Sequence, residues 1–280
     1  MKKPKSYPYL VENYVKYVNL IFSYKLNGVL DLSDENWLSP SNILLLKNVI
    51  SEANKKGGYK PPKNEKVKGY LDYITLKRNS VDVVGGETYI PFSRITDSNA
   101  DSIASKVTGM IGNNLNNDSL QVLKYCIDEL LANITEHSQY HNSFIMLQNY
   151  PKMNELEFSL MDDGISIPGN FRKYMISFDN DCDSLNMALN GISTKDKNGE
   201  RGFGLHSVFE LLTKGMNGKG VLISGRGILS KQFINDGMEP PIELFRYAND
   251  SGEATRFDGC YVAFRVKTDL SPNLYEYLEY

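Results

Sequence analysis

The longest helical pattern in the chain lies between residues 117 and 137, and it carries a polar row beside its apolar face. The apolar residues that recur at three- and four-residue steps are Leu120, Leu123, Ile127, Leu130, Leu131 and Ile134. One face of this helix must therefore pack against a core. Glu129, Asn133 and His137 follow at a strict four-residue spacing and form a row that borders the apolar stripe. This spacing predicts polar groups at the rim of a cleft. The ordinary alternative is a solvated Glu129, an Asn133 bonded to a nearby loop and a surface His137.

Composition excludes several classes of protein. The 280 residues, of which 41% are hydrophobic and 23% charged, can bury a core large enough for one large or two moderate domains. Because 31 basic residues stand against 34 acidic ones, the net charge is −3. No broad basic surface for nucleic acid or an anionic membrane is expected.

Cysteine usage and the N-terminus favour a cytoplasmic protein. Cys126, Cys182 and Cys260 are odd in number and have no metal-ligand spacing, so neither disulfides nor a zinc site is expected, and we infer a reducing compartment. After the basic opening MKKPK, polar residues such as Glu12 and Lys16 interrupt the apolar positions. This interruption argues against both a signal peptide and a membrane span.

Two loops divide the chain. Residues 54–69 are rich in Lys, Gly and Pro, which predicts an exposed loop without a regular element, and a second loop is expected around residues 79–87. Before them, a short strand at residues 29–32 precedes a helix that Ser39 opens with Pro40 at its first position.

The larger region combines the long helix with several strands. Asn117 or Asp118 is expected to cap the helix. Strands are predicted at residues 143–148, 155–160, 221–224, 228–233 and 261–266. Strands beside helices in this arrangement imply an α+β sandwich.

Acidic residues follow directly on one predicted strand. The alternating strand at residues 155–160 runs into Asp162, Asp163 and Gly164. A carboxylate at a strand end can accept a hydrogen bond from an exocyclic amino group such as that of adenine, and glycine lets a flat ring approach closely. A plain Asp-Gly turn is the alternative.

A second glycine-rich stretch opens a later helix. Gly202 and Gly204 stand where the pattern Leu205, Val208, Phe209 begins. Unpaired N–H groups at such a helix end bind anions, and glycines let phosphate oxygens approach the backbone. A polar segment at residues 193–201 precedes it and is able to close over a ligand. Packing or capping, with a solvated loop, is the alternative.

Together these stretches resemble the GHKL superfamily, which includes the ATP-binding domains of gyrase, heat-shock chaperones, histidine kinases and mismatch-repair proteins. The matching motifs are ELLANITEH from residue 129 (the N box), DDGISIP from residue 162 and RGFGL from residue 201 (the two glycine boxes). The match spans roughly residues 115–268. It implies a two-layer α/β sandwich of the Bergerat type over residues 86–280, with a mixed sheet covered by helices.

The resemblance also implies roles for individual residues, with ATP and Mg²⁺ as cofactors. It makes Glu129 the residue that polarises the attacking water, Asn133 the magnesium ligand and Asp162 the reader of adenine. Gly164 would lie beneath the base. The other residues implied around the nucleotide are His137, Ser166, Ile167, Ser193, Thr194, Lys195, Arg201, Gly202, Phe203, Gly204 and Leu205.

Two positions depart from the family pattern. Ser166 stands where the first glycine box usually repeats a glycine, and Glu200 stands two residues before Gly202, where many members have another glycine. The base site and the lid are therefore expected to be tighter or differently shaped.

The N-terminal residues 1–85 are expected to form a small α/β domain. Residues 28–76 resemble, more faintly, a STAS-type domain, the partner fold of bacterial anti-sigma-factor kinases. This alignment gives Ser41 the position that is phosphorylated in STAS antagonists, although the family's loop is replaced here by residues 39–42. The alternative is that Ser39 caps a helix and Ser41 is a first-turn surface residue.

The resemblance implies an enzyme that binds Mg-ATP and hydrolyses it slowly to drive lid closure and signalling to a protein partner. The histidine positions argue against a sensor histidine kinase, because His137, His141 and His206 all lie within or after the N box. The form ELxxNxxxH is closest to the anti-sigma-factor kinases and their ATPase relatives. Two alternatives stay open: a serine/threonine protein kinase acting on a regulatory partner, and a non-hydrolysing, ATP-gated interaction module, with a homodimer possible in each case.

Overall fold

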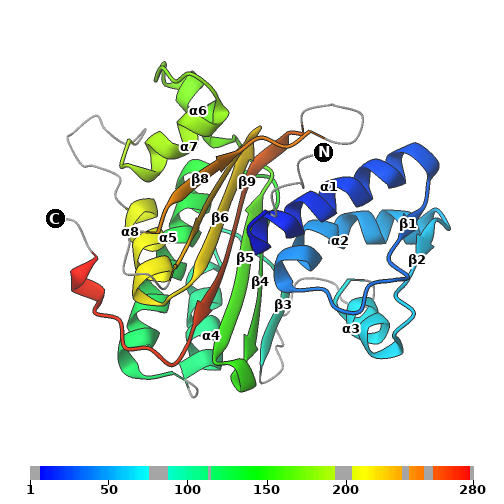
Figure 1. Cartoon of the computed structure of the whole chain (residues 1–280), viewed down its shortest axis with the longest axis horizontal. Coiled ribbons are helices and arrows are strands. Elements are labelled where there is room, and N and C mark those ends of the chain that lie inside the picture. The colour runs from blue at the N-terminus through cyan, green and yellow to red at the C-terminus, as the bar shows by residue number, and fades with distance from the viewer. Residues whose placement is uncertain are drawn as a thin grey trace.

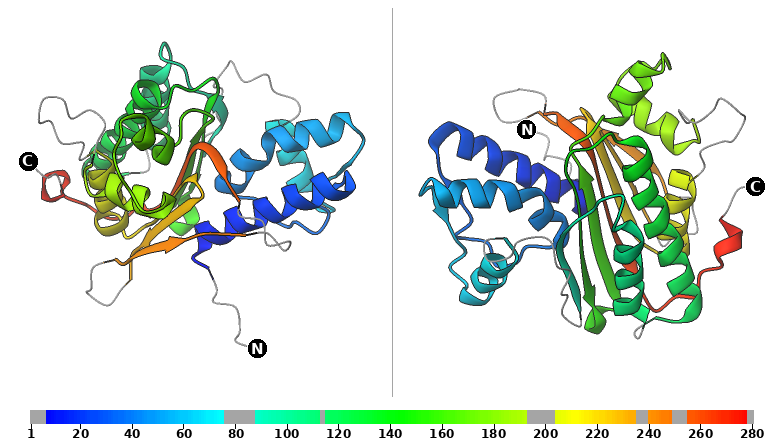
Figure 2. Two further views of the ribbon diagram at one scale, coloured as in Figure 1. Left: turned by 90° about the horizontal axis from the view of Figure 1, so that it is seen from above. Right: turned by 180° about the vertical axis from the view of Figure 1, so that it is seen from behind.

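A single large sheet organises the molecule. The computed structural model describes residues 7–75, 88–112, 115–192, 204–234, 240–248 and 255–277. Within these residues, seven strands form the main sheet in the order β3-β4-β5-β9-β6-β7-β8, and helices cover both of its faces (Figures 1 and 2). The strands are β3 (Tyr89–Arg94), β4 (Ser143–Tyr150), β5 (Glu155–Asp162), β6 (Lys219–Gly225), β7 (Gly227–Gln232), β8 (Ile242–Phe245) and β9 (Phe257–Lys267).

Every neighbouring pair of strands described in this sheet is antiparallel. The α+β class is confirmed, but the expectation of a mixed sheet is wrong. Tight reversals account for two of the six described neighbouring pairs, because a hairpin forces its two strands to run in opposite directions. One reversal is the 3₁₀ turn η1 (Pro151–Met153) between β4 and β5, which Asn154 completes with a φ of 50°. The other joins β6 directly to β7 at Arg226.

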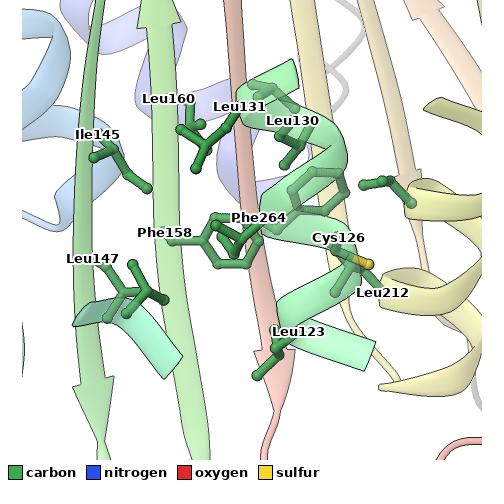
Figure 3. Close-up of a cluster of buried hydrophobic side chains, with 14 of the residues drawn as sticks. Leu123, Cys126, Leu130, Leu131, Ile145, Leu147, Phe158, Leu160, Leu212 and Phe264 are labelled. Carbon is green, nitrogen blue, oxygen red and sulfur yellow. The ribbon is translucent and has the colours of Figure 1, made fainter. Parts of the chain in front are cut away.

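One face of the sheet carries the long helix. The helices after β3 are α4 (Ala100–Gly112), α5 (Asn117–His137), α6 (Ile167–Lys173), α7 (Asp181–Leu189) and α8 (Gly204–Glu210), followed by the π-helical turn η2 (Leu211–Gly215) and the 3₁₀ turn η3 (Leu274–Glu276). Leu123 and Leu130 of α5 pack with Phe158 and Phe264 of the central strands (Figure 3). The cap of α5 is neither Asn117 nor Asp118. It is Asn116, whose side chain accepts a 2.8 Å hydrogen bond from Ser119 N.

The N-terminal region forms a third layer on the opposite face of the sheet (Figure 2). Its elements are α1 (Tyr9–Asn27), β1 (Leu30–Asp31), α2 (Pro40–Lys55), β2 (Tyr59–Lys60) and α3 (Glu65–Thr75), and β1 pairs with β2 in parallel. Ile43 and Leu46 of α2 share one buried cluster with Met146 and Tyr261 of the sheet. The layer is therefore built onto the sheet. The expected domain boundary at residue 85 lies outside the described residues.

The expectation that residues 54–69 hold no regular element is wrong. Both β2 and the start of α3 fall within them. Asn64 begins α3, because its side chain accepts a 3.0 Å hydrogen bond from Lys66 N, and Val67 and Leu71 then bury one face of the helix. The second expected loop, at residues 79–87, lies outside the described residues. No described helix has the length and apolarity needed to cross a membrane.

A buried polar cluster joins the N-terminal layer to the sheet. The Glu157 carboxylate on β5 is fully buried and accepts a 2.7 Å hydrogen bond from Ser41 Oγ. Arg265 Nη1 lies 3.3 Å from the same carboxylate, and Asn13 of α1 donates to Ser41 Oγ at 2.8 Å. Ser39 does take the cap position of α2, but Ser41 is 0% exposed and is not a surface residue.

Candidate functional site

A cavity of about 200 Å³ lies beside the polar row of α5. Six of the residues predicted for the site line it: Glu129, Asn133, Asp162, Ile167, Gly204 and Leu205. They come from α5, the end of β5, the start of α6 and the start of α8. The remaining lining is mostly apolar. An apolar cavity of about 150 Å³ is large enough to bind benzene, so this cavity suits a ring-sized group.

Glu129 and Asn133 lie one helical turn apart on α5 and are both half-buried. The Glu129 carboxylate lies against the first residue of α8, because a Cβ atom built on Gly204 would come within 2.1 Å of Glu129 Oε2. Glycine at position 204 therefore permits this close approach. Glu129, the first member of the row predicted from the helical period, thus touches Gly204 of the second glycine-rich stretch.

Asp162 is a buried carboxyl group in the cavity wall, with 4% of its surface exposed. Its Oδ1 accepts a 2.9 Å hydrogen bond from Gly164 N. Burial raises the pKa of Asp162 to about 7 and outweighs the hydrogen bonds from the backbone of Gly164 and Cys260, while the nearby charge of Asp163 raises the pKa further. Near neutral pH the group is therefore able to exist with or without its proton, as acceptor or donor.

Asp163, next in sequence, has the opposite environment and does not line the cavity. Its Oδ1 accepts hydrogen bonds from His141 N at 2.8 Å and Asn142 N at 2.7 Å. Burial alone would raise the pKa of Asp163, but these bonds and one from the Asn142 side chain lower it overall. Asp163 therefore stabilises the loop after α5 through hydrogen bonds. Of the two neighbouring carboxyl groups, only that of Asp162 lines the cavity and can contact a ligand there.

Gly164 is required by backbone packing. A Cβ at this position would lie 2.0 Å from Ser138 O, and the next residue, Ile165, donates its N–H to that same carbonyl. Gly259, which has a φ of +84°, packs similarly against Asp162 O. Gly164 thus holds the end of β5 against the end of α5 and is not itself in the cavity lining.

Ser166 serves as a helix cap where the family pattern has glycine. Its Oγ accepts a 3.2 Å hydrogen bond from Gly169 N at the start of α6. The following residue, Ile167, lines the cavity and donates its N–H to Ser224 Oγ at 2.9 Å. Ser224 Oγ in turn donates to Gly259 O at 2.7 Å. The departure from the family pattern thus gives α6 a fixed start beside the cavity.

The sequence analysis missed several lining residues, among them Cys260, Asn170 and Phe171. Cys260 stands directly opposite Asp162 in the β5–β9 pairing. Burial, followed by the nearby charge of Asp162, raises the pKa of its thiol to about 12, so the thiol stays protonated. No local pattern indicates Cys260, because only the register between two distant strands brings it to the site.

The structure does not test every predicted residue. Ser193, Thr194, Lys195, Arg201, Gly202 and Phe203 lie outside the described residues, as does the side chain of His137. Within the described part of the chain, no group of three or more His, Cys, Asp or Glu side chains is placed to hold a metal ion. Asn133, in the cavity wall, carries a side-chain carbonyl oxygen of the kind that Mg²⁺ accepts as a ligand.

No protein-family model matches the chain, and no curated protein matches it. The resemblance to the GHKL superfamily therefore rests on the three motifs alone.

Proposed function

We propose that this protein binds Mg-ATP in the cavity beside α5 and hydrolyses it slowly. One observation carries the proposal: residues from all three sequence motifs line the same cavity, although 75 residues separate Glu129 from Gly204. A mostly apolar pocket with a few convergent polar groups and a carboxyl of raised pKa is the usual form of a ligand site.

Each polar group has a task that its position supports. Asp162 accepts a hydrogen bond from the exocyclic amino group of adenine, with the apolar walls against the faces of the ring. Asn133 would hold Mg²⁺ through its side-chain carbonyl oxygen, and the ion would supply charge stabilisation at the phosphates. Glu129 orients the attacking water and takes its proton. Phosphoryl transfer needs mainly this positioning and charge stabilisation.

The proposal is tested with wild type, Glu129→Ala and Asn133→Ala in one buffer. Calorimetry measures Mg-ATP affinity, and a coupled assay measures phosphate release. Asn133→Ala is expected to weaken binding strongly. Glu129→Ala is expected to bind within a few-fold of wild type and to hydrolyse ATP roughly 10²–10⁴ times more slowly, the usual contribution of a positioned general base.

Three results would contradict parts of the proposal. A wild type that binds no ATP ends it. A Glu129→Ala protein that hydrolyses ATP at the wild-type rate removes the catalytic role. If wild type binds ATP without releasing phosphate, the site is not an ATPase site. Labelling of a protein from γ-labelled ATP would then indicate a kinase, and the absence of labelling would indicate an ATP-gated interaction module.

A further inference from the structure

Helices α6 and α7 form one wall of the cavity, at one end of the sheet (Figure 1). Ile167, Asn170 and Phe171 of α6 line the cavity, and Ala188 of α7 and Ile192, which follows α7, complete this wall. The residues proposed for catalysis and metal binding lie on α5 and belong to a different part of the lining. A contact that holds α6 and α7 to the sheet can therefore shape the cavity without touching the catalytic groups.

Asp181, the first residue of α7, bridges α6 and the sheet through its carboxylate. Its Oδ1 accepts a 2.7 Å hydrogen bond from Arg172 Nη2 in the last turn of α6. Its Oδ2 accepts a 2.8 Å hydrogen bond from Arg226 N in the turn between β6 and β7. The Asp181 side chain is only 13% exposed, so this bridge is better shielded from water than an ordinary surface ion pair.

The β6–β7 turn has a glycine on each side of Arg226, where it meets Asp181. Gly225 has a φ of +61°, and a Cβ atom there would lie 2.6 Å from Asp181 Oδ2. A Cβ atom on Gly227 would lie 2.7 Å from Asp181 O. A larger residue at either position would push the start of α7 away from the sheet, so both glycines permit the bridge.

Two aromatic rings connect the bridge to the cavity. The Arg172 guanidinium lies over the ring of Phe178, 5.0 Å from its centroid, in the loop between α6 and α7. Phe178 meets Phe171 edge to face, with ring centroids 6.1 Å apart. Phe171 is 3% exposed and lines the cavity. Contacts therefore run without a break from Asp181 to the cavity wall.

We propose that Asp181 and Arg172 are positioning residues for nucleotide binding, because their bridge to the β6–β7 turn fixes the cavity wall that contacts the adenine ring. This inference rests on the proposed function. Without the bridge, α6 and α7 also occupy displaced positions, and the observed affinity falls in proportion to the fraction of molecules whose wall is correctly placed. The rate of hydrolysis at saturating Mg-ATP is spared, because every bound molecule then has the wall in place and Glu129 lies on α5.

The test compares Asp181→Asn, Arg172→Gln and the double variant with wild type. Asn keeps the shape of the side chain but offers only one acceptor oxygen. We expect each single variant to bind Mg-ATP about tenfold more weakly by calorimetry, as when the correctly placed fraction falls to about one-tenth. ADP should lose the same factor, and hydrolysis at saturating Mg-ATP should stay near the wild-type rate. The double variant should lose less affinity than the product of the two single losses, since both residues act in one bridge.

Asp31→Asn is the matched control. In the N-terminal layer, Asp31 likewise accepts a hydrogen bond from one backbone group, Ser33 N at 3.0 Å, and from one cation, Lys60 Nζ at 3.0 Å. It does not line the cavity. Its replacement should therefore leave nucleotide affinity unchanged.

Other outcomes overturn the inference. Unchanged affinity in both single variants, or an equal loss in Asp31→Asn, removes the positioning role. A loss of the saturated rate as large as the loss of affinity identifies a general distortion of the site. Weaker binding of ATP with unchanged binding of ADP places the effect at the phosphates and not at the wall.

Two features of the test keep its result decisive. Arg172→Gln changes an exposed side chain and remains informative if Asp181→Asn does not fold. If wild type binds no nucleotide, the proposed function fails and this inference with it, whereas normal binding by wild type confines any failure to the inference.

Discussion

Replacing Asp162 with Asn is expected to raise the free energy of unfolding above neutral pH. The same change is expected to remove the preference of the protein for ATP over GTP. The pKa of Asp162 is raised from 3.8 to about 7 by burial. Between about pH 4 and pH 7 the folded state therefore keeps a proton that the unfolded state has released. Wild-type stability should fall as the pH rises through this window and stay level above it. Asn does not ionise and escapes this loss.

The magnitude follows from the two pKa values. Their difference, at about 1.4 kcal/mol per pH unit, corresponds to roughly 4 kcal/mol. An amide offers one acceptor oxygen in place of two, so a backbone hydrogen bond from Gly164 or Cys260 is lost at a cost of about 1–3 kcal/mol. The variant should be more stable than wild type by roughly 1–3 kcal/mol at pH 8 and less stable by a similar amount near pH 4.

Urea unfolding at several pH values between 4 and 8 measures the difference in stability between Asp162→Asn and wild type, both where it should be positive and where it should be negative. Asp163→Asn is the matched control. Because the pKa of Asp163 is lowered, its stabilising contribution is fully present above its unfolded pKa and is lost only as the pH falls below about 4. The control should lose the same stability at pH 5 and at pH 8. A constant difference between Asp162→Asn and wild type across the whole range would refute the reasoning. If Asp162→Asn kept the wild-type preference for ATP over GTP, the role of Asp162 in recognising the base would be refuted.

Three further predictions concern other parts of the molecule. A methyl group on Gly204 would overlap the flexible end of the Glu129 side chain. Gly204→Ala should therefore leave the melting temperature nearly unchanged but lower the rate of phosphate release strongly. Normal turnover in this variant would show that the contact between Gly204 and Glu129 is not needed. Glu157→Ala breaks a fully buried polar cluster and should cost about 3 kcal/mol in urea unfolding. The control Asp258→Ala removes an exposed ion pair and should lower the free energy of unfolding by no more than about 1 kcal/mol. Equal losses of stability in Glu157→Ala and Asp258→Ala would contradict the role of the buried cluster. EDTA should weaken ATP binding by wild type but have little further effect on Asn133→Ala, as calorimetry can measure.

The sequence by itself determined the local elements. The helical period placed Glu129 and Asn133 in one row beside the apolar stripe of α5, and the alternation at residues 155–160 placed Asp162 at a strand end. The pattern also predicted β4, β6, β7 and β9, with errors of a few residues at their ends. These features depend on neighbours three or four residues apart in a helix and two apart in a strand, so they can be read without any knowledge of the fold.

Some elements could not be predicted from the sequence, because tertiary hydrogen bonds stabilise the polar residues that interrupt their apolar pattern. Polar residues such as Lys16 interrupt the apolar pattern of α1 in the sequence, yet its Asn13 is buried and donates a hydrogen bond to Ser41. Edge strands β3 and β8 also gave no clear signal. Half of β8 is exposed apolar surface, as at Ile242 and Leu244, so its residues do not alternate between buried and solvated in the expected way.

Only the tertiary structure decided which distant residues meet. The antiparallel pairing of β5 with β9 puts Cys260 beside Asp162, and the packing of α5 on α8 puts Glu129 against Gly204. Nothing local to either partner encodes these pairs. A shift of one residue in the strand register would turn every side chain of β9 to the opposite face of the sheet, so the register is set by the burial of two whole strands and not by the residues that form the site.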